Sequence, residues 1–168
     1  NTLGGNTVTL VNDLDVAGNF VVCSGAPWLG GTFNASGRYQ KVAGNFTVHY
    51  SSLPYGNYNP ATTLEFNGNA TQNYFNRGIL SGVTINHTGP GVILGNSGAT
   101  DWMLVGGTLT MNQGRIITAA NRVNVINNSA TAVSIGNINS YVEGNLKRAF
   151  ASTGGSYDFP VGTAAKGY

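Results

Sequence analysis

Apolar side chains along this chain come in short alternating runs rather than in long stripes. Val8 and Leu10 flank a threonine, and Leu109 and Met111 flank another. Alternation with a period of two places the two sets of side chains on opposite faces of a β-strand. No segment carries an apolar stripe long enough at helical spacing to predict a helix, and glycine and asparagine steps suited to turns separate the runs. The pattern predicts an all-β protein of short strands.

A seven-residue phrase returns after 26 positions, as VAGNFVV at 16–22 and VAGNFTV at 42–48. A second phrase, VTIN at 83–86, returns as LTMN at 109–112, again 26 positions later. A fixed period of this length is typical of solenoids, in which each period forms one coil. Coils that stack about 4.8 Å apart place equivalent residues directly above one another. We therefore predict a parallel β-helix (β-solenoid) of about six coils with a period near 25 residues.

The residues that stay the same between the two copies predict the inward face of this solenoid. Phe20 and Phe46 share the parity of the unchanged valines and glycines, whereas the opposite parity changes between copies. We expect Gly44 to allow a corner, and Asn19 and Asn45 to stack there and to hydrogen-bond along the axis. An antiparallel β-sandwich is the alternative fold, but it does not require a fixed period.

The period divides the chain into two parts. Residues 1–150 are predicted to form the solenoid, with a loop insertion near 50–60 that interrupts the period. The glycine- and serine-rich run that follows ends the repeat, so residues 151–168 are predicted to be an exit segment toward a following module. The chain begins without Met and without a visible signal peptide, so we expect it to be a piece of a longer protein.

Composition narrows the classes of function. Only 8% of the residues are charged, against about 25% in an average globular chain. The net charge of +2 is scattered, which indicates neither nucleic acid nor an anionic membrane as a partner. No apolar run is long enough for membrane insertion. A single cysteine, Cys23, excludes a disulfide framework.

Aromatic residues in turn-rich segments are the candidate ligand-binding residues. The loop at 50–60 carries two prolines and interrupts the coil period. Exposed aromatic rings in such a loop could stack on a sugar or on a partner chain, or could instead pack against the flank of the rod. The candidates are Tyr50, Tyr55 and Tyr58 in this loop, together with Trp28 and Trp102.

Two carboxylates are weak candidates for a metal or acid–base site. Asp13 and Asp15 are two positions apart, so on a strand they share a face. Calcium takes six to eight oxygen ligands, and no further carboxylate lies near them in the sequence. His49 and His87 do not occur at metal-ligand spacing. We predict no catalytic residue, no metal site and no cofactor.

Two segments carry a resemblance to a known class of protein. LTMNQG at 109–114 is similar to an LTLNSG repeat phrase, and SYVEGNLKR at 140–148 followed by YDFPVG at 157–162 is similar to an ordered SYVxGPLxR … FPVG pair, with Asn145 in place of the usual proline. The chain thus resembles the repetitive β-solenoid stalk regions of large secreted surface proteins of Bacteroidetes, the kind exported by the type IX secretion system. The resemblance implies export, an extracellular or cell-surface location and an adhesin-like or filament-like role. It carries no catalytic residues.

These observations predict a non-catalytic structural or adhesive segment that acts as a stalk or spacer. Its expected partners are neighbouring modules of a longer chain, or another protein, at the solenoid ends, with surface polysaccharide as a further partner. Two alternatives remain open. One is a carbohydrate-binding module that uses Trp28, Tyr55 and Tyr58, and the other is a fragment of a polysaccharide lyase or hydrolase centred on Asp13 and Asp15.

Overall fold

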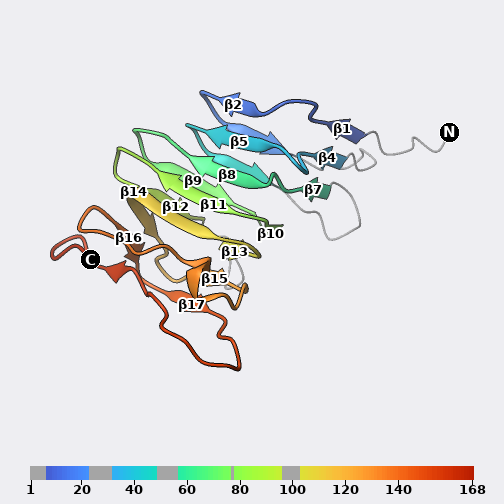
Figure 1. Ribbon diagram of the computed structural model, residues 1–168. Helices are drawn as coiled ribbons and strands as arrows, with labels where there is room; N and C mark the ends of the chain where they lie inside the picture. Colours follow the sequence, from blue (N-terminus) through green and yellow to red (C-terminus); the bar gives the residue numbers. More distant parts are fainter. Residues whose placement is uncertain (1–6, 23–31, 49–56, 77, 96–102) are drawn as a thin grey trace.

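The chain forms a parallel β-solenoid of about five turns (Figure 1). The computed structural model describes residues 7–22, 32–48, 57–76, 78–95 and 103–168. All strand pairs between named strands are parallel, and each strand pairs with strands from the neighbouring coils. The described residues contain no α-helix, only a single 3-10 turn, η1 (Ala130–Ala132). The predicted fold class is confirmed.

The parallel strands form four ladders, two of which β14 joins into one sheet, and each ladder is called here a sheet and named after its first strand. The β1 sheet contains β1 (Thr7–Thr9), β4 (Thr32–Asn34) and β7 (Asn57–Asn59). The β2 sheet contains β2 (Leu14–Val16), β5 (Tyr39–Val42), β8 (Thr63–Phe66), β11 (Val83–Asn86) and the first part of β14 (Leu109–Ile117). The β3 sheet contains β3 (Phe20–Val22), β6 (Phe46–Val48), β9 (Gln72–Phe75), β12 (Val92–Leu94), the second part of β14, β16 (Ser140–Glu143) and β18 (Val161–Gly162). The β10 sheet contains β10 (Ile79–Leu80), β13 (Met103–Val105), β15 (Val123–Val125) and β17 (Leu146–Arg148).

The register of the β3 sheet explains the repeated phrase. Phe20 pairs with Phe46, and Phe46 pairs with Tyr74 on the next coil. Their rings stack, with centroids 5.3 Å apart for the first pair and 5.8 Å for the second. Val21 and Thr47, the position that changes between the copies, point outward. The unchanged parity is therefore the inward face, as predicted.

A ladder of asparagines follows the corner beside this aromatic column. The amide N–H of Asn45 donates to Asn19 Oδ1 at 2.8 Å, and that of Asn73 donates to Asn45 Oδ1 at 2.7 Å. The predicted axial bonding of Asn19 and Asn45 is confirmed, and Asn73 continues it. Such bonds satisfy the backbone donor of one coil with a side chain of the preceding coil, so they fix the register of the stack.

The solenoid makes about five turns instead of the predicted six, because its last passes are irregular. β14 runs from the β2 sheet into the β3 sheet without a break. On the next pass the chain forms η1 and a lone bridge between Leu109 and Val133 instead of another strand of the β2 sheet. Val133 is buried whereas Ile135, two positions later, is exposed, so this stretch does not form a buried strand face.

The segment 151–168 returns to the end of the solenoid (Figure 1). β18 pairs in parallel with β16, and the amide of Val142 donates to the carbonyl of Pro160 at 2.7 Å. This part of the predicted exit segment therefore extends the β3 sheet by one strand.

Candidate functional site

The structure places one of the five aromatic candidates, Tyr58, and it is buried. Tyr50, Tyr55, Trp28 and Trp102 lie outside the described residues. Tyr58 pairs with Phe33 on the preceding coil, the two rings stack at 6.1 Å between centroids, and the Tyr58 hydroxyl donates to Gln40 Oε1 at 2.8 Å. Of the two alternatives open for this ring, Tyr58 packs inward, because strand alternation in β7 turns its side chain toward the core, so it is not available as an exposed ligand-binding ring.

The two candidate carboxylates are placed as parts of the coil stack. Asp13 Oδ1 accepts a hydrogen bond of 2.8 Å from the amide of Tyr39 at the start of β5. Asp15 lies in register with Lys41 on the next coil. Among the residues that the structure describes, no three His, Cys, Asp or Glu side chains gather to hold a metal ion. These contacts favour structural roles for both aspartates.

A polar cluster lies on the outer surface of the β2 sheet. The Tyr39 hydroxyl donates to Glu65 Oε2, and the side-chain amide of Asn86 donates to Glu65 Oε1 at 3.1 Å. Glu65 is buried, although it belongs to the outward parity of β8. Burial of the Tyr39 phenol, followed by its hydrogen bond to Glu65 and the charge of that carboxylate, raises the pKa of Tyr39 to about 12.

This pKa predicts how stability changes at alkaline pH. An unfolded tyrosine loses its proton near pH 10, whereas Tyr39 in the folded chain keeps it until about pH 12. The contribution of Tyr39 is therefore complete below pH 10 and decreases as the pH rises to about 12. We expect the free energy of unfolding of the wild type to fall more steeply over this range than that of Tyr39→Phe.

Absorbance of the phenolate provides the direct measurement. The difference between the titration curves of the wild type and Tyr39→Phe isolates this one tyrosine and should give a pKa near 12. Glu65→Gln should lower that pKa only in part, because burial is the largest cause of the shift. A difference curve with its midpoint near pH 10 would contradict the assignment.

A polar groove of about 690 Å³ lies over β14 and the beginning of β16. Four segments of the chain line the groove. They are residues 87–89, residues 113–115, the three residues Ile138, Asn139 and Tyr141, and residues 164–167. The first three segments are stacked, since His87 donates its amide to Gln113 and Gly114 donates to Asn139, both at 2.9 Å. We call this hollow the β14 groove. It is the strongest candidate binding site in the described part of the chain.

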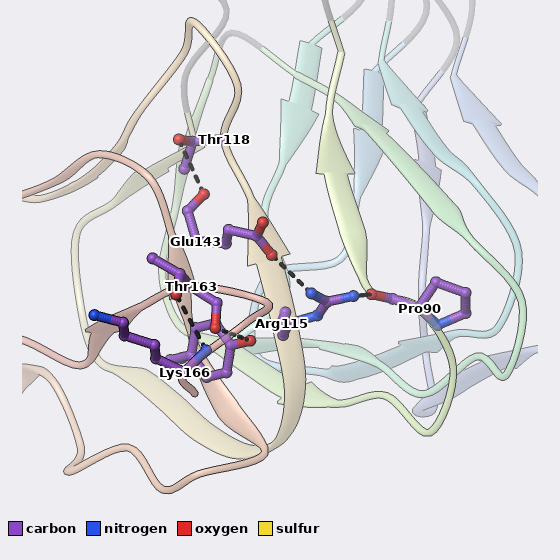
Figure 2. Close-up of polar contacts among 7 residues, drawn as sticks. Pro90, Arg115, Thr118, Glu143, Thr163 and Lys166 are labelled. Carbon is purple, nitrogen blue, oxygen red and sulfur yellow. Dashed lines mark hydrogen bonds and ion pairs between the residues drawn. The ribbon is translucent and has the colours of Figure 1, made fainter. Parts of the chain in front are cut away.

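An ion pair holds the guanidinium of the groove in place. Arg115 donates to Glu143 Oε2 at 2.8 Å through Nη1 and to the carbonyl of Pro90 at 3.0 Å through Nη2. Figure 2 shows the guanidinium between these two acceptors, and it shows the Lys166 side chain extending away from Arg115. Because Glu143 compensates the charge of Arg115, Lys166 is the one lining cation without an acidic partner among the described residues.

The histidine of the groove is a structural group. His87 is fully buried, its Nδ1 accepts from the amide of Gly89 at 3.0 Å, and its Nε2 lies 2.8 Å from the carbonyl of Ala70. Since the Gly89 amide can only donate, Nδ1 must be unprotonated and Nε2 must carry the hydrogen. Both ring nitrogens are thus engaged, and neither is free to act as a base. His87 therefore offers no free ring nitrogen to the β14 groove.

The sequence pattern does not single out Gln113 or Asn139 as binding residues. Gln113 follows the repeated LTMN phrase, Asn139 precedes SYVEG, and neither belongs to a motif of binding chemistry. The period could have shown that Gln113 and Asn139 lie side by side on neighbouring coils, since they are 26 positions apart. The period could not have shown that the turn at 164–167 forms another wall of the groove.

The described residues contain no helix that is long and apolar enough to cross a membrane. Comparisons of the chain with family models, with curated proteins and with solved structures find no match.

Proposed function

We propose that this chain is a rigid, non-catalytic spacer in an exported cell-surface protein. The observation that supports this proposal is the axial stack of like residues, in which Phe20, Phe46 and Tyr74 form one column and Asn19, Asn45 and Asn73 form another. Backbone bonds and side-chain bonds along the axis resist bending between coils, because bending must break several of them together. A spacer needs this property and needs no reactive group.

Export and an adhesin-like role rest on the resemblance to secreted surface proteins. A skin of neutral polar residues fits a surface location, since it limits non-specific attraction to charged molecules. Neighbouring modules or another protein at the ends of the solenoid are the proposed partners. An antibody raised against the segment should label intact cells of the producing organism, and labelling only after lysis would contradict the proposed location.

Stiffness can be measured with two spin labels. We expect Thr9→Cys and Lys147→Cys, placed on exposed positions of β1 and β17 in a Cys23→Ser background, to give one narrow distance distribution by pulsed electron resonance. The same sample in urea provides the broad reference. A broad or multiple distribution under native conditions would overturn the spacer proposal.

Of the two alternatives, carbohydrate binding has an observation in its favour, which is the β14 groove. The polysaccharide-acting enzyme is less favoured, because the Asp13 carboxylate is bonded to a backbone amide. Carbohydrate binding by the loop near 50–60 can be tested by comparing the wild type with Tyr55→Ala on a polysaccharide array. Tyr58→Ala is not a suitable second variant for this test, since Tyr58 belongs to the core and its loss would disturb folding.

A further inference from the structure

We propose that the β14 groove binds a neutral, hydroxyl-rich saccharide. Its volume of about 690 Å³ lies within the range of roughly 300–1,000 Å³ in which proteins bind small ligands. The groove is partly open to solvent, so it can accommodate a few sugar units, whereas a closed cavity would admit only a small free ligand. The proposal is independent of the spacer proposal, because a rigid rod can carry this site or lack it.

Two side-chain amides supply the recognition chemistry. Gln113 and Asn139 are exposed, lie on neighbouring coils and line the groove. Their backbones are bonded between coils, but in the part of the chain that the structure describes neither side-chain amide makes a hydrogen bond. A carboxamide both donates and accepts, as does each hydroxyl of a sugar ring. Two amides at coil spacing therefore offer paired contacts to adjacent hydroxyls.

An apolar strip beside the amides fits the other face of a sugar ring. Ile138 is 69% exposed, which is high for so large an apolar side chain, and it lines the groove next to Asn139. Ala164 and Ala165 on the opposing turn are also exposed. Pyranose rings carry C–H groups between their hydroxyls, and burial of this surface against apolar side chains is favourable.

The groove is held in shape before a ligand arrives. β14 and β16 pair from Gly114 to Ile117, and the amide of Asn139 donates to Asn137 Oδ1 at 2.9 Å. The Tyr141 hydroxyl donates to the carbonyl of Thr163 at 3.0 Å, which ties the turn at 163–167 to the floor. A backbone that is already in place avoids the entropic cost of ordering the strands and the turn when a ligand binds.

The charges favour a neutral ligand over an anionic one. Arg115 is paired with Glu143, which leaves Lys166 as a single lining cation without an acidic partner among the described residues. Phosphate-rich ligands such as nucleic acids need several unpaired cations, and a peptide strand would need an open sheet edge or apolar pockets. At the groove, β14 is already paired on both sides, with β11 through Gln113 and with β16 through Gly114 and Arg115. A neutral saccharide matches these conditions best.

The test uses the full chain and defined sugars. Neutral tetrasaccharides, namely cellotetraose, maltotetraose, mannotetraose and xylotetraose, and the acidic tetragalacturonate are titrated by calorimetry and by amide chemical shifts. We expect saturable binding of at least one neutral tetrasaccharide, with shifts at Gln113 and Asn139. Loss of two hydrogen bonds in Gln113→Ala/Asn139→Ala should weaken that binding about tenfold.

Matched variants separate binding from folding. Asn59→Ala removes an exposed amide from β7, away from the groove, and should leave the affinity unchanged. Ala165→Trp places a large ring in the groove from an exposed turn and should abolish sugar binding. This variant still tests the proposal if Gln113→Ala/Asn139→Ala fails to fold. The proposal is overturned if none of the four neutral sugars binds, if only tetragalacturonate binds, or if binding persists unchanged in Ala165→Trp.

Discussion

Gly44→Ala is expected to destabilise the solenoid by about 2–3 kcal/mol, and Gly44→Val by more. A Cβ atom at Gly44 would lie 2.5 Å from the carbonyl carbon and 2.6 Å from the carbonyl oxygen of Gly18 on the preceding coil. Both atoms belong to the backbone, and Gly44 donates its own amide to that same oxygen at 3.0 Å. The clash can therefore be relieved only by separating the two coils.

Gly18→Ala is the matched control for this prediction. Gly18 occupies the same place in the repeated phrase, but a Cβ there would meet nothing within 4 Å. It should change the free energy of unfolding by no more than about 0.5 kcal/mol. Urea unfolding followed by circular dichroism gives both values. Equal midpoints for Gly44→Ala and Gly18→Ala would contradict the account of this corner.

Arg148→Met is expected to destabilise the C-terminal end of the solenoid by about 3 kcal/mol. Arg148 is buried, and its guanidinium donates to the carbonyls of Asp158, Ser129 and Ala130 at 2.7–3.0 Å. It also lies 4.7 Å from the centroid of the Tyr157 ring. Methionine keeps much of the volume but leaves three carbonyls without this donor.

Lys147→Met tests whether the effect depends on these contacts. Lys147 neighbours Arg148 on β17 but is exposed, so its replacement should change stability by no more than about 0.5 kcal/mol. Hydrogen exchange locates the change, because Arg148→Met should accelerate exchange at the Val142 amide, which donates to Pro160. Unchanged exchange there would show that Arg148 does not hold the returning segment.

Much of the solenoid could be predicted from repetition. Identical residues 26 positions apart indicated that Phe20 would stack on Phe46, because a parallel coil stack places like on like. The same logic predicted the bond between Asn19 and Asn45. The number of turns was predicted less accurately. A lone bridge at Val133 replaces a strand, and the spacing of the repeats does not reveal this change.

The candidate sites show where sequence information ends. Tyr58 reads as a loop aromatic in the sequence, yet β7 turns it into the core, since the direction of one side chain depends on where a short strand begins. Asp13 reads as half of a carboxylate pair, yet it bonds the amide of Tyr39. These outcomes depend on contacts between coils, which composition and spacing do not specify.

The sequence by itself determined the strand class, the period and the inward parity, because these follow from alternation and from the match between successive repeats. Tertiary structure alone decided the β14 groove and the place of the C-terminal segment. The 26-residue period brings Gln113 beside Asn139, but the turn at 164–167 joins them through contacts that do not repeat, such as the bond from the Tyr141 hydroxyl to the carbonyl of Thr163. Local pattern records the interactions that repeat along the chain, whereas a groove assembled once at the end of a rod depends on contacts that occur only there.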